Sequence, residues 1–327
     1  MNDNLIVLGG GESGVGTAYL ANQNGINVFL SDKNFIELKY RNILIENNIE
    51  FEEGVHSTEK VLKASEIVKS PGIPNDSILV AKIIKNNIPI ISEIEFASRF
   101  TNAKIIGVTG SNGKTTTTSL IYHILKSSGL NVGIGGNIGN SFAFLVAKND
   151  YDFIVLELSS FQLEGISKFK PTIAVITNLS PDHLERYEFN FNRYVNAKFN
   201  IILNQKNSDY LVYNAEDSKI NEELNSREIN SFKIPFSFSK GNSFNQTYLE
   251  NNNIKSEINK NKFMISIESL TLKGRHNVQN SMAAATVAQL LNITNQDLKE
   301  SLSNFQSISH RMEHVLTIQK VKYINDS

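Results

Sequence analysis

The fold of this chain is decided by one glycine-rich stretch, Gly107-Val108-Thr109-Gly110-Ser111-Asn112-Gly113-Lys114-Thr115-Thr116. The apolar residues 104–109 before it predict a buried strand, and residues 114–127 predict a helix. A glycine-rich turn between a strand and a helix presents backbone N–H groups and the positive end of the helix to an anion. The stretch therefore predicts a loop that binds phosphate.

Lys114 and Thr115 indicate which phosphate compound the loop binds. In such a loop the lysine reaches the β- and γ-phosphates of a nucleoside triphosphate, and the hydroxyl that follows it holds Mg²⁺. We therefore expect ATP and Mg²⁺ as cofactors. The residues expected to contact ATP here are Gly110, Ser111, Asn112, Gly113, Lys114, Thr115 and Thr116.

The glycine spacing departs from the usual pattern of such loops. Val108 stands where the first glycine is expected, and the glycines fall at Gly107, Gly110 and Gly113. The alternative is a hairpin turn at Asn112-Gly113. The lysine and the run of threonines that follow, together with an apolar helix, disfavour a hairpin.

Residues 1–92 predict a Rossmann-like domain. Strands are expected over residues 5–8, 27–31, 66–70 and 89–91, and helices over 14–24 and 35–46. Strands that alternate with helices indicate parallel βαβ units. Gly9-x-Gly11-x-x-Gly14, followed by Asp32 at the end of a strand, is a dinucleotide fingerprint that predicts pyrophosphate at a helix N-terminus. Taken alone it favours an NAD-dependent oxidoreductase, which stays open as the alternative function.

Residues 93–299 predict a P-loop NTPase-like central domain with a mostly parallel sheet. Further strands are expected over 131–134, 153–158 and 173–177, and helices over 277–291 and 295–303. Residues 231–267 alternate in short pieces broken by turn residues, which predicts appended antiparallel hairpins. The expected fold class is therefore α/β. A hairpin is also expected over 315–324, and because the chain stops directly after it, residues 300–327 are expected to be the stub of a truncated third domain.

Three polar residues downstream of the loop, Glu157, His183 and Lys198, predict a metal site. Glu157 lies in an apolar strand, His183 follows a strand, and Lys198 lies on the apolar stripe of a helix. Taken singly, each has an ordinary explanation as a structural acid, a turn histidine and a lysine that extends to solvent. Together they favour a Mg²⁺-nucleotide site. Because burial lowers the pKa of a lysine, its neutral amine can react with CO₂, so we hypothesise that Lys198 is a carbamate.

Composition and charge exclude several classes of protein. The formal net charge is -1, which gives no electrostatic footprint for nucleic acid. The absence of cysteine excludes disulfides and thiolate metal sites. The N-terminus has no basic segment of the kind found in signal peptides, and no apolar run is long enough for membrane insertion. We expect a cytoplasmic monomer.

Five ordered motifs together resemble the Mur ligases. They are residues 107–116, Gly136-Asn137-Ile138-Gly139, residues 156–164, residues 178–184 and His310-Arg311-Met312-Glu313. Within that family, Ser159-Ser160-Phe161-Gln162 and Ser70-Pro71-Gly72-Ile73-Pro74 favour the branch that adds D-glutamate to UDP-N-acetylmuramoyl-L-alanine in peptidoglycan synthesis. The resemblance covers the whole chain and implies an ATP-driven amide ligase that works through an acyl phosphate.

The resemblance also implies roles for individual residues. Those implied in catalysis are Lys114, His183 and Lys198, and those implied to hold metal are Thr115, Glu157, His183 and Lys198. Further ATP contacts would be Asn277, Asn280, Arg311 and Asp326. The nucleotide sugar would contact Gly11, Glu12, Ser13, Asp32, Gly72, Asn137 and Ser159.

Members of this family continue into a third domain that closes over ATP and binds D-glutamate. Only a stub beginning near Glu300 is expected here. We therefore expect these residues to bind the UDP-sugar without completing amide formation. A fragment that binds nucleotides without catalysis is the remaining interpretation.

Overall fold

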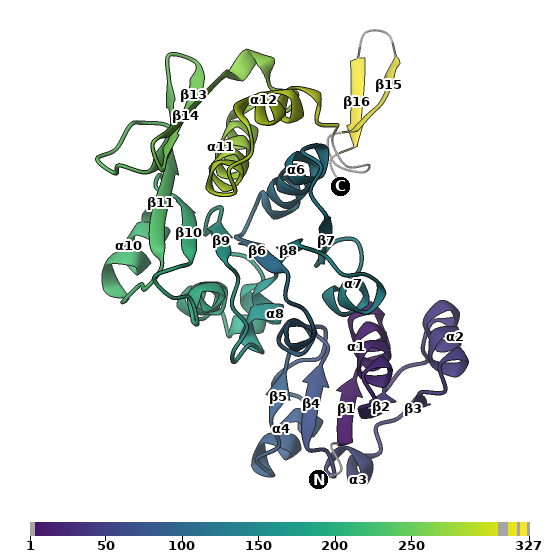
Figure 1. Cartoon of the computed structure of the whole chain (residues 1–327). Helices are drawn as coiled ribbons and strands as arrows, with labels where there is room; N and C mark the ends of the chain where they lie inside the picture. Colours follow the sequence, from purple (N-terminus) through teal and green to yellow (C-terminus); the bar gives the residue numbers. More distant parts are fainter. Residues whose placement is uncertain (1–3, 307–312, 319–320, 326–327) are drawn as a thin grey trace. The chain divides into compact units, whose positions relative to one another are not determined.

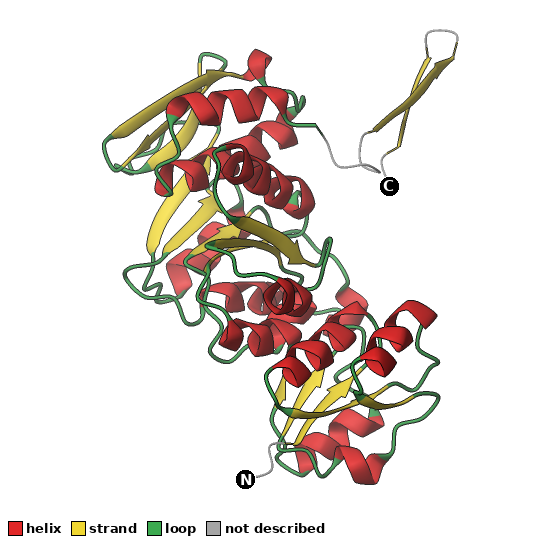
Figure 2. Ribbon diagram, turned by 45° about the vertical axis from the view of Figure 1, so that its right-hand side comes forward, coloured by secondary structure: helices red, strands yellow, loops and turns green. Residues whose placement is uncertain are grey.

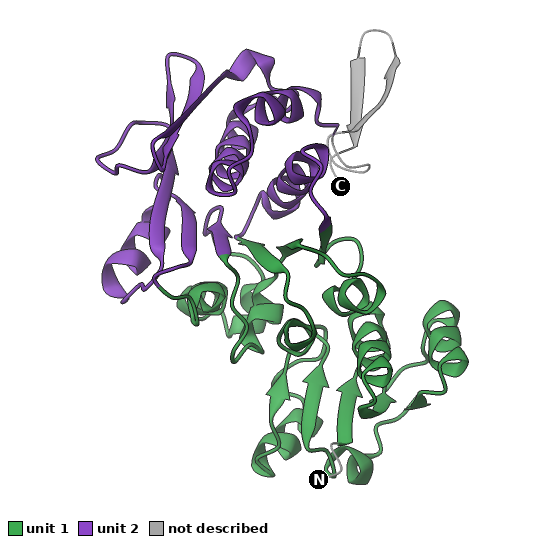
Figure 3. Cartoon of the chain, in the orientation of Figure 1, with its two compact units in different colours: residues 1–109, 133–172, 181–206 green, residues 110–132, 173–180, 207–327 purple. Residues whose placement is uncertain are grey.

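The computed structural model describes residues 4–306, 313–318 and 321–325, with side chains for residues 4–306. The chain forms two compact units. Unit 1 comprises residues 1–109, 133–172 and 181–206, and unit 2 comprises residues 110–132, 173–180 and 207–327 (Figure 3). The predicted boundaries at 92 and 299 are a different division of the chain and stay a prediction.

Unit 1 begins with a five-stranded parallel sheet in the order β3-β2-β1-β4-β5. Its strands are β1 (Asn4–Leu8), β2 (Asn27–Ser31), β3 (Glu50–Glu52), β4 (Glu66–Lys69) and β5 (Ile90–Ile91). The helices are α1 (Glu12–Gln23), α2 (Leu38–Glu46), α3 (Thr58–Val61) and α4 (Ile78–Lys85), which lie alongside the strands (Figures 1 and 2). Ile6, Phe29, Ile67 and Ile83 belong to its core. The Rossmann-like prediction is confirmed.

Several local features of this part of unit 1, including the unpredicted helix α3, differ from the sequence prediction. Helix α2 begins at Leu38 rather than residue 35, because Phe35 is exposed and the N–H of Ile36 donates to Glu53 Oε2 at 3.0 Å. Strand β3 was not predicted, since three residues are too few to show alternation. Helix α4 was also missed; only Val80 and Ile83 of it are buried.

The remainder of unit 1 contains neighbouring strands in the order β6-β8-β7. They are β6 (Lys104–Thr109), β8 (Phe153–Glu157) and β7 (Val132–Gly136), and β6 pairs with β8 in parallel. The helical segments are α5 (Glu93–Ala97), η1 (Ser98–Phe100), α7 (Phe142–Lys148), α8 (Ser160–Glu164), η2 (Leu184–Tyr187), α9 (Phe191–Phe199) and η3 (Asn200–Ile202). Both β6 and β8 are almost wholly buried, as is typical of parallel strands covered on both faces.

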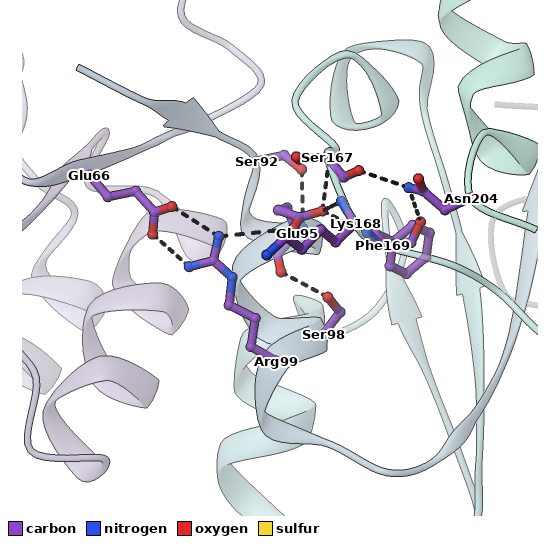
Figure 4. A network of polar contacts seen from close by, with 9 residues as sticks. All are labelled: Glu66, Ser92, Glu95, Ser98, Arg99, Ser167, Lys168, Phe169 and Asn204. Atoms are coloured by element: carbon purple, nitrogen blue, oxygen red, sulfur yellow. Dashed lines mark hydrogen bonds and ion pairs between the residues drawn. The ribbon is translucent and has the colours of Figure 1, made fainter. Parts of the chain in front are cut away.

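A buried carboxylate on α5 holds a distant segment of unit 1 (Figure 4). Glu95 Oε2 accepts the backbone N–H groups of residues 167, 168 and 169 at 2.9, 2.9 and 2.8 Å. The side chain of Asn204 donates to two carbonyls of the same segment at 3.0 Å. Arg99 forms a bidentate pair with Glu66 on β4 at 2.7 and 2.9 Å. The connection after the first sheet is therefore tied to β4 and to the segment that follows α8.

Unit 2 is built around one buried helix. Its strands are β9 (Ile173–Ile176), β10 (Tyr210–Asn214), β11 (Phe232–Ser237), β12 (Gln246–Glu250), β13 (Asn253–Ile258) and β14 (Asn261–Ser266), adjacent in this order. The helical segments are α6 (Lys114–Ser127), α10 (Ser218–Ser226), η4 (Ile267–Ser269), α11 (Arg275–Leu290) and α12 (Asn295–Asn304). Helix α11 is buried along most of its length and packs against α6 and against β10 to β13 (Figure 1).

The hairpin prediction for residues 231–267 is confirmed only in part. Strands β12, β13 and β14 are antiparallel, but β11 pairs in parallel with both β10 and β12. The sequence reading missed β10, so it also missed the crossover through α10 that makes β10 and β11 parallel. At the chain end, β15 (Glu313–Ile318) and β16 (Val321–Asn325) form the predicted hairpin.

The α/β fold class is confirmed, with one parallel sheet and strands of both orientations in the rest. Within the described residues, none of the helices combines the length and the apolarity needed to cross a bilayer.

Candidate nucleotide sites

The phosphate loop of unit 2 requires glycine at two positions. Gly110 has φ +145° and Gly113, at the N-cap of α6, has φ +79°. A Cβ added at Gly110 would lie 2.0 Å from Thr177 Oγ1, and a Cβ added at Gly113 would lie 2.5 Å from Asn280 Oδ1. Val108, by contrast, is a fully buried residue of β6. The unusual spacing thus places the glycines where the backbone and its neighbours demand them.

Polar groups that follow β9 hold this loop. The N–H groups of Ser111 and Asn112 donate to the carbonyl and side-chain oxygens of Asn178, both at 2.9 Å. Thr177 Oγ1 and Asn178 Nδ2 donate to the carbonyl of Asn112 at 2.6 and 2.9 Å. Ser111 Oγ donates to the carbonyl of Ser180 at 2.8 Å. Side chains and backbone of unit 2 therefore hold the loop in this shape.

Lys114 begins α6 and folds over the loop. Its Nζ donates to the carbonyl of Ser111 at 2.8 Å. Thr115 and Thr116 are half-buried in the first turn of the helix. An ammonium group in this position lies where an anion bound at the helix N-terminus would carry its charge.

Helix α11 brings two predicted ATP residues to the same loop. Asn280 is buried and accepts a hydrogen bond from Thr117 Oγ1 at 3.2 Å. Its Nδ2 donates to Asn277 Oδ1 at 3.2 Å, and Asn277 Nδ2 donates to the carbonyl of Lys273. The predicted ATP residues of unit 2 that the structure describes therefore converge. Arg311 and Asp326 lie outside the described residues.

Unit 1 contains a cavity of about 490 Å³ at the first glycine-rich turn. The predicted residues that line it are Gly11, Glu12, Ser13, Asp32 and Gly72. Residues that the sequence reading did not assign also line it, namely Gly9, Lys33, Asn34, His56, Ser70, Pro71, Ile73, Pro74, Ser77 and Leu79. Residues 70–74 could have been found from the motif Ser70-Pro71-Gly72-Ile73-Pro74, whereas nothing local to His56 marks it as a site residue.

Two features shape the turn in this cavity. Asp32 accepts the N–H groups of Gly10 and Asn34 at 2.6 and 2.8 Å, so its carboxylate is fixed beside the turn. Gly9 has φ +104°, and a Cβ at Gly14 would lie 1.8 Å from the carbonyl oxygen of Gly9. The backbone is therefore held close enough for a pyrophosphate to approach the N-terminus of α1.

His56, which lines the cavity, is held by a hydrogen-bonded chain of Ser31 and Glu52. Its Nδ1 lies 2.6 Å from Ser31 Oγ, which donates to Glu52 at 2.7 Å. Burial lowers the pKa of His56. Burial also acts to raise the pKa of Glu52, but hydrogen bonds from Ser57 and Ser31 outweigh it and hold that pKa below its ordinary value. Near neutral pH, His56 is accordingly an uncharged hydrogen-bonding group.

Asn137 and Ser159, both predicted to contact the sugar nucleotide, are not among the residues that line this cavity. Asn137 Nδ2 donates instead to Glu157 Oε1 at 2.8 Å. Ser159 caps α8 and forms a capping box with Gln162. Asn137 therefore belongs with the predicted metal ligand Glu157, and Ser159 with the N-terminus of α8. Glu12 has a second role as well, since its Oε1 accepts the N–H of Ser141 at 2.9 Å.

Glu157 carries an observation that fits a cation. Its side chain is 2% exposed, and Oε2 has no hydrogen-bond partner among the described residues. A buried carboxylate oxygen without a partner is costly, and carboxylate oxygens are ligands that Mg²⁺ prefers. The residues present thus fit a divalent cation at this oxygen.

Lys198 does not extend to solvent. It is 2% exposed on α9, and its Nζ lies 4.6 Å from the centre of the Tyr194 ring. The explanation that this lysine reaches solvent from an apolar face is therefore wrong. Burial is the condition that carbamylation requires, and carbamylation itself stays a prediction.

His183 is the most exposed of the three predicted metal ligands, with a side chain 54% exposed. It has φ +49° at the start of η2, and its ring lies 5.5 Å from that of Phe161. Within the described part of the chain, no three His, Asp or Glu side chains gather where they could hold a metal. The predicted trio of Glu157, His183 and Lys198 therefore depends on a modified Lys198 for one of its ligands.

Comparison with known proteins agrees with this architecture. Residues 108–288 match the Mur ligase middle domain, and residues 5–79 match the MurD N-terminal domain. The UDP-N-acetylmuramoylalanine–D-glutamate ligase of Christiangramia forsetii is 49% identical over 327 residues, which cover 100% of this chain and 73% of the relative. The protein of the same name from Bacteroides fragilis is 47% identical over 99% of this chain and 72% of its own length.

Solved structures show the same fold. The UDP-N-acetylmuramate:L-alanyl-gamma-D-glutamyl-meso-diaminopimelate ligase from Neisseria meningitides has a TM-score of 0.65 at 18% identity, over 94% of this chain and 100% of that chain. The UDP-N-acetylmuramate-alanine ligase from Thermotoga maritima has a TM-score of 0.59 at 22% identity, over 99% of this chain and 74% of that chain. From the domain matches and the identity to its relatives, this chain belongs to the Mur ligase family.

Proposed function

We propose that this chain binds the two nucleotide substrates of a ligase that uses ATP to join D-glutamate to UDP-N-acetylmuramoyl-L-alanine, a step of peptidoglycan synthesis. The observation that carries the proposal is that one chain contains two glycine-rich turns at helix N-termini, each with a different charged side chain beside it. Unit 1 has a pyrophosphate-type turn with Asp32 beside it, and unit 2 has a phosphate loop with Lys114. The names of the relatives at 47–49% identity support this choice of substrates.

The chemistry would proceed in two transfers. The carboxylate of UDP-N-acetylmuramoyl-L-alanine attacks the γ-phosphorus of ATP, and the bond between that phosphorus and the β,γ-bridging oxygen breaks. ADP departs, and the substrate now carries an acyl phosphate. The amine of D-glutamate then attacks the acyl carbon, phosphate departs, and the amine loses a proton. Both steps are governed by positioning and by neutralisation of phosphate charge.

The chain's own residues supply the positioning. The N-terminus of α6 and the ammonium group of Lys114 would hold the triphosphate, while Asn277 and Asn280 would lie beside the same nucleotide. Mg²⁺, when bound, would supply positive charge to the phosphates. Thr115, Glu157, His183 and carbamylated Lys198 are the proposed holders of metal, and Asn137 would orient the carboxylate of Glu157 through its 2.8 Å hydrogen bond.

Unit 1 would bind the nucleotide sugar through its pyrophosphate. The N-terminus of α1 and the turn at Gly11 and Ser13 face the cavity, and Asp32 would accept a ribose hydroxyl. In this proposal Glu12 and Gly72 complete the cavity wall, and Ser159 contacts the sugar end of the substrate. We further propose that the protein works as a cytoplasmic monomer.

Ligand specificity tests the proposal directly. Isothermal titration should give micromolar or tighter binding of UDP-N-acetylmuramoyl-L-alanine and at least ~10-fold weaker binding of UDP-N-acetylmuramic acid. NAD⁺ is the control for the oxidoreductase alternative and should not compete. With both substrates and MgATP, mass spectrometry tests for the D-glutamyl product, with L-glutamate as control. Competition by NAD⁺, or no binding of the UDP-sugar, would reject the proposal.

A further inference from the structure

Residues 70–74 form the wall of the unit 1 cavity that follows β4. Every residue of this segment lines the cavity. Its start is anchored by the N–H of Ser70, which donates to the carbonyl of Leu8 at 2.9 Å. Inside it, the N–H of Ile73 donates to the carbonyl of Ser70 at 3.1 Å. A turn with so few internal bonds needs support from outside to keep one conformation.

Two basic side chains provide that support by donating hydrogen bonds to backbone carbonyls of the turn. Arg186 Nη2 donates to the carbonyl of Pro71 at 3.1 Å, and Lys69 Nζ donates to the carbonyl of Ile73 at 2.7 Å. Just beyond the turn, Asn75 Nδ2 donates to Glu164 Oε2 at 2.9 Å. Burial lowers the pKa of Lys69 to about 8, so its charge is costly where it stands.

Arg186 makes a second contact that Lys69 lacks. Its guanidinium carbon lies 4.4 Å from the centre of the Phe161 ring. Phe161 in turn stacks on Tyr187, with centroids 5.9 Å apart and planes at 9°, and lies 5.5 Å from the His183 ring. The backbone N–H of Arg186 also donates to the carbonyl of His183 at 3.0 Å. One side chain therefore contacts both the cavity wall and the aromatic group beside His183.

The charge and planar shape of the guanidinium group explain why arginine suits position 186. A guanidinium can stack on an aromatic face while an edge N–H donates to a carbonyl, which an ammonium group cannot do with one geometry. We propose that Arg186 is a positioning residue for the reaction, which sets residues 70–74 to receive the nucleotide sugar and aligns that wall with Phe161 and His183. The role in substrate binding rests on the proposed function.

The test compares Arg186→Met and Arg186→Lys with Arg193→Met. Arg193 is an exposed residue of α9 that pairs with Glu188, so its loss should leave the cavity unchanged. We expect Arg186→Met to weaken UDP-N-acetylmuramoyl-L-alanine ~10-fold in isothermal titration, and Arg186→Lys to recover only part of that loss. Affinity for a non-hydrolysable ATP analogue should stay within about twofold of wild type. A general structural defect would lower both affinities together.

A second measurement does not depend on the substrate. Amide hydrogen exchange of residues 70–75 should become faster in Arg186→Met and stay unchanged in Arg193→Met. Equal exchange and equal UDP-sugar affinity in wild type and Arg186→Met would overturn the inference. If the wild-type chain fails to bind the UDP-sugar, the proposed function fails, and the role of Arg186 in the reaction fails with it. Faster exchange in Arg186→Met with unchanged UDP-sugar affinity would reject the positioning role and leave Arg186 only as a support of the turn.

Discussion

In unit 1 the glycine-rich turn before α1 lies beside the carboxylate of Asp32, whereas in unit 2 the loop before α6 is covered by the ammonium group of Lys114. Both turns use the same device, a helix N-terminus with left-handed or close-packed glycines. A carboxylate favours the hydroxyl groups of a ribose, and an ammonium group favours a triphosphate. Under the proposed function, the charged side chain beside each turn would select a different ligand for two similar backbones.

The units also differ in what holds them together. Unit 1 uses buried carboxylates, since Glu93 and Glu95 each accept backbone N–H groups of segments that are distant in the sequence. Unit 2 packs its sheet on the buried helix α11, in which Met282 and residues 283–285 are wholly enclosed. We therefore expect unit 1 to be more sensitive to changes of single charges and of pH.

The largest effect is expected for Glu95→Ala. The substitution leaves three backbone N–H groups without their acceptor, so the free energy of unfolding should fall by about 3 kcal/mol. Urea unfolding followed by circular dichroism measures this change. Glu50→Ala, at an exposed position of β3, is the matched control and should change stability by less than about 0.5 kcal/mol. A change for Glu95→Ala no larger than that of the control would contradict the role given to this network.

Lys114→Met should affect the two units unequally. Loss of the ammonium group should weaken binding of an ATP analogue ~100-fold, because a charged hydrogen bond to phosphate is lost. Binding of UDP-N-acetylmuramoyl-L-alanine should be unchanged. Lys126→Met, an exposed position on the same helix, is the control. If ATP affinity survives in Lys114→Met, the loop does not hold the triphosphate as described.

Asp32→Ala is the reciprocal change in unit 1. It removes the acceptor for the N–H groups of Gly10 and Asn34 and an acceptor for a ribose hydroxyl. The UDP-sugar should bind ~10-fold more weakly, with the ATP analogue unaffected. Glu46→Ala, exposed at the end of α2, controls for the loss of a negative charge. Equal losses in Asp32→Ala and Glu46→Ala would mean that net charge, not this contact, matters.

The smallest effect is a pH-dependent one at Glu93. Burial raises its pKa to about 7, although the N–H of Ala143 bonds the charged form. The folded protein therefore holds a proton that the unfolded chain releases between about pH 4.5 and 7, so stability falls as pH rises through that window. Glu93→Gln should be about 1 kcal/mol more stable than wild type at pH 8.5 and show little gain at pH 4.5.

Thermal unfolding at the two pH values measures this difference. Glu59→Gln, exposed on α3, should behave as wild type at both. A gain of the same size at both pH values would show that shape rather than ionisation causes it.

Sequence reasoning succeeded where the cause is local. Gly110 and Gly113 could be predicted because a tight turn before a helix imposes its own backbone demands. The buried strand β6 and the helix α6 follow from hydrophobic periodicity, and their bounds agree with the prediction. Burial of Lys198 was anticipated from its place on an apolar helical stripe.

Features created by distant contacts were missed. Glu95 bonds backbone groups 72 to 74 residues away, and nothing in the neighbouring sequence indicates those partners. Arg186 contacts the carbonyl of Pro71, 115 residues earlier, and looks by sequence like an ordinary basic residue. The contact of Asn137 with Glu157 was also not predicted, while the placement of Asn137 and Ser159 beside the sugar-nucleotide substrate stays a prediction.

The central claim is that each unit carries its own nucleotide site. It is tested most directly by isothermal titration of the wild-type chain, Lys114→Met and Asp32→Ala with UDP-N-acetylmuramoyl-L-alanine and with a magnesium-bound ATP analogue. We predict one site for each ligand in the wild type, with Lys114→Met losing only the ATP analogue and Asp32→Ala weakening only the UDP-sugar. Competition between the two ligands for one site, or loss of both in either variant, would contradict the account.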